Sequence, residues 1–92
     1  MQFEDIKFTD QHIPKGKFAL LNFGKYQLSV VCHEGSYGGN AGLYEIGVFQ
    51  GANMIELPGI TQEGDTVKGW LNETEVTGII KKMTAITGKE PK

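Results

Sequence analysis

The chain has 92 residues, of which 39% are hydrophobic and 22% are charged, and its formal net charge is −2. This length and composition predict a single globular domain spanning residues 1–92 and exclude a disordered chain. All nine basic residues are lysine, and the lack of arginine together with the acidic balance argues against sequence-specific DNA binding.

The first seventeen residues carry few regular signals. Residues 3–8 fit either an edge strand or an irregular lead-in. Residues 10–17 contain Pro14 and Gly16, which interrupt regular structure. We therefore expect a loop over residues 10–17.

A hairpin is predicted next. Residues 18–23 and 26–32 are rich in apolar residues, and Gly24 suits the first central position of a two-residue type II′ turn between them. Side chains alternate between the two faces of a strand. Cys32, the single cysteine, shares a face with Leu28, and we expect it to be a small buried apolar residue.

The middle of the chain alternates between strands and glycine-rich connections. Residues 33–42 read as a loop, and residues 43–49 as a third strand. Residues 54–57 are expected to close a second hairpin, and residues 66–70 to form a fifth strand. Trp70, at the end of that strand, is expected in the core of so small a protein; the alternative is an interface anchor, because tryptophan is enriched at hot spots.

The last third carries the clearest signal, a helix from residue 73 to residues 84–86. Asn72 can cap its start, and Glu75 three residues later can complete a capping box. One apolar stripe at helical spacing contains Val76, Ile79, Ile80 and Met83. The predicted fold is α+β: an antiparallel sheet of about four to five strands with one C-terminal helix packed on one face.

No catalytic or metal-binding pattern is evident. His12 and His33 are the two histidines, and no zinc-site spacing exists. The glycines of residues 35–42 do not lead into a helix, so they match neither a P-loop nor a dinucleotide fingerprint. We expect a protein that is not an enzyme and that uses no metal or cofactor.

Acidic residues in the second half lack the spacing of a catalytic pair. They are Glu45, Glu56, Glu63 and Asp65. Two interpretations stay open for them: a solvated face, or an acidic patch that meets a lysine- or arginine-rich partner.

The N-terminal residues and the length of the apolar runs indicate where in the cell the protein is expected. Residues 1–5 are acidic, whereas a signal peptide begins with positive charge and an apolar segment. Apolar runs such as residues 18–21 are too short to cross a bilayer. We expect a cytoplasmic protein with no membrane partner.

Three segments of the sequence resemble short accessory proteins of tailed bacteriophages. They are residues 42–49, 56–61 and 64–71, within a resemblance that covers residues 26–83. Within that group the size, acidity and α+β pattern are similar to type I-F anti-CRISPR proteins. The resemblance implies a non-enzymatic inhibitor that binds Cas subunits of the crRNA-guided surveillance complex and stops target DNA from binding. A phage structural or assembly module and a small ligand-binding protein remain alternatives.

The expected contact residues lie in two regions. Tyr37 is a large amphipathic ring in the adaptable 34–42 loop, a composition typical of binding loops. Local lysines can also meet a guide RNA backbone, even in an acidic protein. The predicted partner-binding residues are Tyr37, Asn40, Glu34, Lys15, Lys17 and Lys25.

Overall fold

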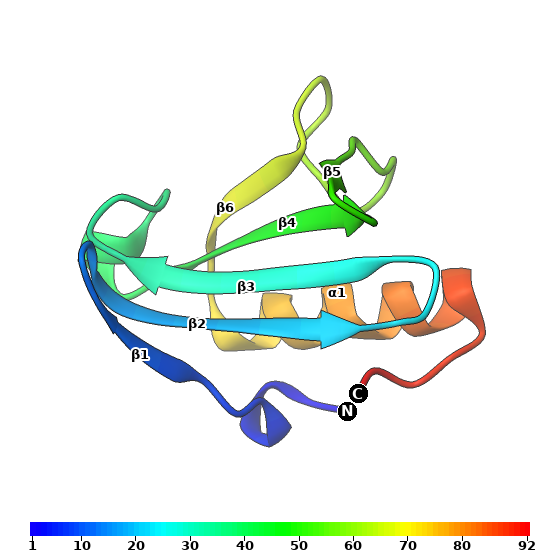
Figure 1. Cartoon of the computed structure of the whole chain (residues 1–92), viewed down its shortest axis with the longest axis horizontal. Helices are drawn as coiled ribbons and strands as arrows, with labels where there is room; N and C mark the ends of the chain where they lie inside the picture. Colours follow the sequence, from blue (N-terminus) through cyan, green and yellow to red (C-terminus); the bar gives the residue numbers. More distant parts are fainter.

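A computed structural model describes residues 1–92 and shows one antiparallel sheet with a single α-helix (Figure 1). The sheet runs in the order β1-β2-β3-β4, and the far edge of β4 is shared by β5 and β6. The strands are β1 (Thr9–His12), β2 (Lys15–Asn22), β3 (Gln27–His33), β4 (Tyr44–Gln50), β5 (Asn53–Met54) and β6 (Val67–Leu71). Helix α1 spans Glu73–Thr87, and two short 3₁₀ turns occupy Phe3–Asp5 and Gly39–Ala41. The predicted α+β class is confirmed.

Helix α1 begins at the predicted capping box. The Glu75 amide donates to Asn72 Oδ1 at 2.8 Å, and the Asn72 amide donates to Glu75 Oε1 at 3.0 Å. Gly88 ends the helix in the left-handed conformation, with φ of 70°. The four residues of the predicted apolar stripe are all buried. The helix packs by this stripe and presents its polar side to solvent.

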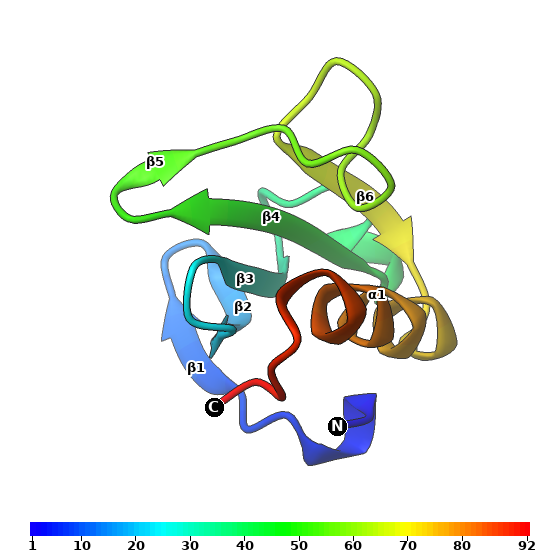
Figure 2. The ribbon, with the colours of Figure 1, turned by 90° about the vertical axis from the view of Figure 1, so that its right-hand side faces the viewer.

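The core lies between α1 and one face of the sheet. Seen from the side, the twisted sheet curls around the helix (Figure 2). The sheet contributes every second side chain of its central strands to the core. Leu28 and Val30 of β3 and Ile46 and Val48 of β4 are fully buried. The helix therefore covers one face of the sheet and leaves the other uncovered.

The N-terminal segment corrects one prediction. Residues 10–17 are not a loop, because β1 pairs with β2 in a hairpin whose register joins Thr9 to Phe18 and His12 to Lys15. Pro14 lies in the tight turn, where it interrupts no ladder. Residues 3–8 form a 3₁₀ turn and an irregular lead-in, the second of the two alternatives. The sheet therefore has one more strand on this edge than expected.

The lead-in closes one end of the core with aromatic rings. Phe3 packs edge-on against Tyr44, with ring centroids 4.9 Å apart, and Phe8 lies 5.7 Å from the same ring. The Phe3 amide donates to Thr77 Oγ1 of α1 at 2.9 Å. The N-terminal segment is thus tied to both the helix and the sheet.

Strand β6 contains a bulge. Tyr44 pairs with Leu71 and Ile46 pairs with Lys68, so Gly69 and Trp70 together face the single residue between those two β4 positions. The extra residue brings Leu71 into register with buried Tyr44 and turns Trp70 outward. Trp70 is 63% exposed, so its predicted place in the core is wrong.

Candidate functional site

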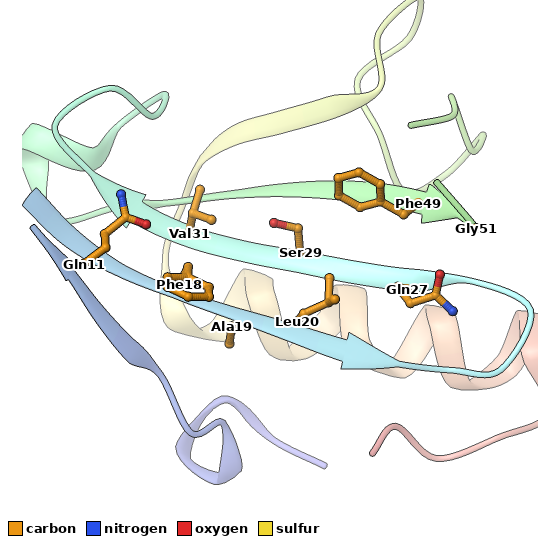
Figure 3. Close-up of a pocket in the computed structure, with 9 residues that line it drawn as sticks. All are labelled: Gln11, Phe18, Ala19, Leu20, Gln27, Ser29, Val31, Phe49 and Gly51. Carbon is orange, nitrogen blue, oxygen red and sulfur yellow. The ribbon is translucent and has the colours of Figure 1, made fainter. Parts of the chain in front are cut away.

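The uncovered face of the sheet carries a continuous set of apolar side chains. Cross-strand pairing aligns Phe18 with Val31, Leu20 with Ser29, and Phe49 with Met54. Figure 3 shows this face with α1 behind the sheet. We call it the open face and define it by Phe18, Leu20, Val31, Phe49 and Met54.

These side chains are accessible to solvent. Leu20 is 58% exposed, Met54 44% and Phe18 40%, although each belongs to a strand. Next to Leu20 in sequence, Leu21 points to the helix side and is 5% exposed. Solitary exposed apolar residues are ordinary, whereas a contiguous group of them marks an interaction surface.

A shallow hollow of about 450 Å³ lies in the open face. None of its nine lining residues is charged, although 22% of the chain is. Its polar contributors are the neutral side chains of Gln11, Gln27 and Ser29. An apolar centre with neutral hydrogen-bonding groups at its margin is the composition of a protein interface.

The predicted binding loop is held in place by its own hydrogen bonds. Ser36 Oγ accepts from the His33 amide and donates to the His33 carbonyl oxygen, both at 2.9 Å. Tyr37 is 58% exposed beyond this anchor. The loop therefore presents the Tyr37 side chain from an ordered backbone.

Tyr37 lies beside the outward-turned Trp70. The Trp70 amide donates to the Tyr37 carbonyl oxygen at 3.1 Å, and both side chains line two adjoining hollows. We call Tyr37 and Trp70 the aromatic corner. Sequence reasoning identified the first residue and expected the second in the core because the protein is small, whereas the bulge turns it outward.

Four of the predicted contact residues line one hollow of about 410 Å³: Lys15, Lys17, Glu34 and Asn40. Asp10 and His33 line it too, so its charges are mixed. An RNA backbone favours an excess of positive charge over such a mixture. The predicted contact with guide RNA stays a prediction.

Lys17 lines that hollow and also contacts two aromatic rings outside its lining. Its Nζ lies 4.8 Å from the Phe8 ring centroid and 5.4 Å from that of Tyr44. A hydrogen bond with Tyr44 raises the pKa of Lys17, while its partial burial acts in the opposite direction. Lys17 is therefore a cation that helps hold the lead-in against the sheet.

Lys25 is separate from the other predicted residues. It occupies the turn between β2 and β3, with its Nζ 5.3 Å from the Tyr26 ring centroid. Lys15 begins β2 and Lys25 follows its end, so the strand separates them. The six predicted residues therefore lie in three places: around the mixed-charge hollow of about 410 Å³, at the aromatic corner and in this turn.

Groups with metal-binding or nucleophilic chemistry are sparse. No cluster of three or more His, Cys, Asp or Glu side chains could hold a metal ion. Cys32 is half-buried, and its Sγ contacts the Gly39 carbonyl oxygen at 3.7 Å. His33 Nδ1 accepts from the Gly35 amide at 3.0 Å, which gives this ring a role in shaping the loop.

The open face was not identified from the sequence. A signal existed, since residues 18–21 are apolar at consecutive positions and a strand directs consecutive side chains to both faces. Whether the second face was covered depended on where the single helix packs.

No helix of the chain is both long and apolar enough to span a membrane.

No family model, curated protein or solved structure matches this chain. We therefore argue its function from the surfaces described above.

Proposed function

We propose that this chain is a non-enzymatic protein that acts by binding another protein through its open face. The observation that carries the proposal is the contiguous apolar surface on the side of the sheet opposite α1, whose hollow has no charged lining residue. Burying the exposed part of such side chains is favourable by roughly 25 cal/mol per Å² of apolar area. A protein surface with its own apolar centre is the occupant that gains most from this face.

The position of the open face on paired strands suits this role. Phe18, Val31 and Phe49 belong to β2, β3 and β4, which are hydrogen-bonded to one another along most of their length. The backbone of such a scaffold loses little further freedom on binding, which lowers the entropic cost of association. Met54 on the short β5 adds a flexible side chain that can adapt to a partner.

The proposed partner follows from the phage resemblance. In this proposal the chain acts in the host cytoplasm, binds Cas subunits of a type I-F surveillance complex, and blocks target DNA. Its net charge of −2 and its apolar open face support steric blocking of a protein subunit more than mimicry of DNA.

The test uses one variant on the open face and one matched control. Leu20→Glu places a charge at the centre of the open face, and Ile86→Glu places the same charge on α1, where Ile86 is 50% exposed. Purified wild type, Leu20→Glu and Ile86→Glu are each added to a type I-F complex, and co-elution and target-DNA affinity are measured.

We expect wild type and Ile86→Glu to co-elute with the complex and abolish DNA binding, and Leu20→Glu to bind at least about tenfold more weakly. Failure of the wild type to co-elute or to change DNA affinity would reject the proposed partner. Equal binding by Leu20→Glu and wild type, with both folded by circular dichroism, would reject the open face as the interface.

A further inference from the structure

The backbone of Trp70 is unusual in this chain. Nine residues have positive φ, and eight of them are glycine; the ninth is Trp70, with φ of 60°. A side chain in this conformation costs about 1 kcal/mol or more, and glycine would avoid it. Trp70 recovers little of that cost by packing, because it is 63% exposed. A large aromatic ring is thus held in water at a strained position.

The side chain of Trp70 borders a hollow of about 270 Å³, which is small for a whole ligand and suits a single side chain. Tyr37 forms another part of its wall, and Asp65, Gln62 and Lys68 supply polar groups. The backbone amide of Thr66 donates to Asp65 Oδ1 at 2.7 Å, which orients that carboxylate.

The carboxylates near the aromatic corner form no ion pair within the chain. The one ion pair of the structure joins the Met1 amine to Glu90, so neither Asp65 nor Glu45 has a paired cation, and Lys68 lies beyond ion-pair distance of both. Glu45 is the β4 residue that faces the bulge. Partial burial raises the pKa of Glu45, against the opposing effects of a backbone hydrogen bond from Tyr37 and of the nearby His33 ring, and the Asp65 charge adds a smaller increase.

We propose that the hollow at the aromatic corner binds an arginine side chain of a partner protein. A guanidinium group is planar, stacks on Trp and Tyr rings, and can direct its N–H donors to a carboxylate at the same time. Tyr37 and Trp70 supply the rings, and Asp65 supplies the acceptor. This hollow adjoins the open face, since Val67 of its lining pairs with Gly47 of β4, but the inference concerns a different chemistry and is tested separately.

The charge pattern favours a cationic occupant over the other classes that stack on aromatic rings. A nucleotide would bring its phosphate near Asp65 and Glu45, where like charges repel. A neutral sugar could stack on the same rings and donate hydroxyl hydrogen bonds to Asp65, but it would bring no positive charge to that carboxylate. Lys68 is the one positive charge in the lining of the hollow. Its removal should strengthen the binding of a cation, which tests the expected charge of the occupant.

The measurement uses the intrinsic fluorescence of Trp70, the single tryptophan of the chain. End-blocked hexa-arginine is titrated into the protein, and a hexa-citrulline peptide, which has the same shape without the charge, is the matched ligand. The protein variants are Asp65→Asn, Tyr37→Ala and Lys68→Gln. Glu4→Gln removes an equal charge from the exposed 3₁₀ turn near the N-terminus and is the control.

We expect a saturable change of Trp70 fluorescence with hexa-arginine and none with hexa-citrulline. Asp65→Asn should weaken binding about fivefold and Tyr37→Ala about threefold to tenfold, while Lys68→Gln should strengthen it about twofold. Glu4→Gln should change affinity by less than the Asp65 variant.

Three results would overturn the inference. They are no saturable change at millimolar hexa-arginine, equal responses to the arginine and citrulline peptides, and equal weakening by Asp65→Asn and Glu4→Gln. Asp65→Asn keeps an oxygen for the Thr66 amide, so the proposal stays testable even if Tyr37→Ala disturbs the loop. No surveillance complex is used, so failure here is distinct from failure of the proposed function.

Discussion

The backbone amide of Trp70 donates a 3.1 Å hydrogen bond to the carbonyl oxygen of Tyr37. This bond joins the 34–42 loop to the bulge of β6, two segments that are separated by about thirty residues of chain. Gly69, which precedes Trp70, permits the approach because a side chain there would meet the Tyr37 side chain. The aromatic corner therefore depends on the absence of one Cβ atom.

Substitution Gly69→Ala should destabilise the fold by about 1–3 kcal/mol, the range for inserting an atom into a packed contact. An alanine Cβ would collide with Tyr37 Cβ and lie 2.9 Å from the Tyr37 carbonyl oxygen, so the loop or the strand must move. Urea unfolding followed by circular dichroism measures the change. Gly78→Ala is the control, because a Cβ there has open space in α1 and should raise stability by up to about 1 kcal/mol. Loss of stability in both variants would contradict this explanation.

Replacement of Trp70 by glycine should leave the free energy of unfolding within about 1 kcal/mol of wild type or raise it. The residue is largely exposed and its φ of 60° favours glycine, so the loss of side-chain contacts is offset by relief of backbone strain. Chemical denaturation followed by circular dichroism tests this. A loss above about 2 kcal/mol would show that the indole ring is structural and would weaken its assignment to binding.

Two neighbouring leucines in β2 should respond very differently to truncation. Leu21→Ala should cost about 2–5 kcal/mol, because Leu21 is 5% exposed and packs in the core. Leu20→Ala should change stability by less than about 0.5 kcal/mol, because the open face is uncovered. Parallel thermal and urea unfolding gives both values. Similar losses would mean that something covers the open face.

The pH dependence of stability should include a contribution from Glu45. Partial burial raises its folded-state pKa above 4.5 and outweighs the backbone hydrogen bond from Tyr37 and the nearby His33 ring, which act in the opposite direction, so folding favours the protonated carboxyl. The stabilising contribution is complete below pH 4.5 and is lost as pH rises through the folded-state pKa.

Glu45→Gln should therefore be slightly more stable than wild type at neutral pH and equal to it near pH 3, where the carboxyl is protonated. Denaturant unfolding at the two pH values measures the difference, with Glu4→Gln as the exposed-carboxyl control. A variant that is less stable than wild type at neutral pH would contradict the expected direction of the Glu45 contribution to stability.

The elements with strong local signals were predictable. Asn72 and Glu75 identify the start of α1 because a capping box uses two side chains at fixed spacing, and the structure has both bonds. The inward face of β3, with Leu28 and Val30, followed from simple alternation. These features depend on residues close together in the sequence.

The features that were missed depend on distant pairing. Thr9 to His12 lack a strand signal of their own and become β1 because β2 offers them an edge. Trp70 turns outward because β6 has one residue more than β4 over the same span, and no local pattern reports that excess. The open face became apparent once the packing of α1 left Phe18 and Leu20 uncovered.

The most direct test of the open face is hydroxyl-radical footprinting of the chain, free and bound to a type I-F surveillance complex, read by mass spectrometry. We predict that Leu20 and Met54, both exposed in the free chain, become protected in the complex, while Ile86 on α1 keeps its reactivity. Unchanged reactivity of Leu20 and Met54 in a complex that does form, or protection centred on Ile86 instead, would contradict the account.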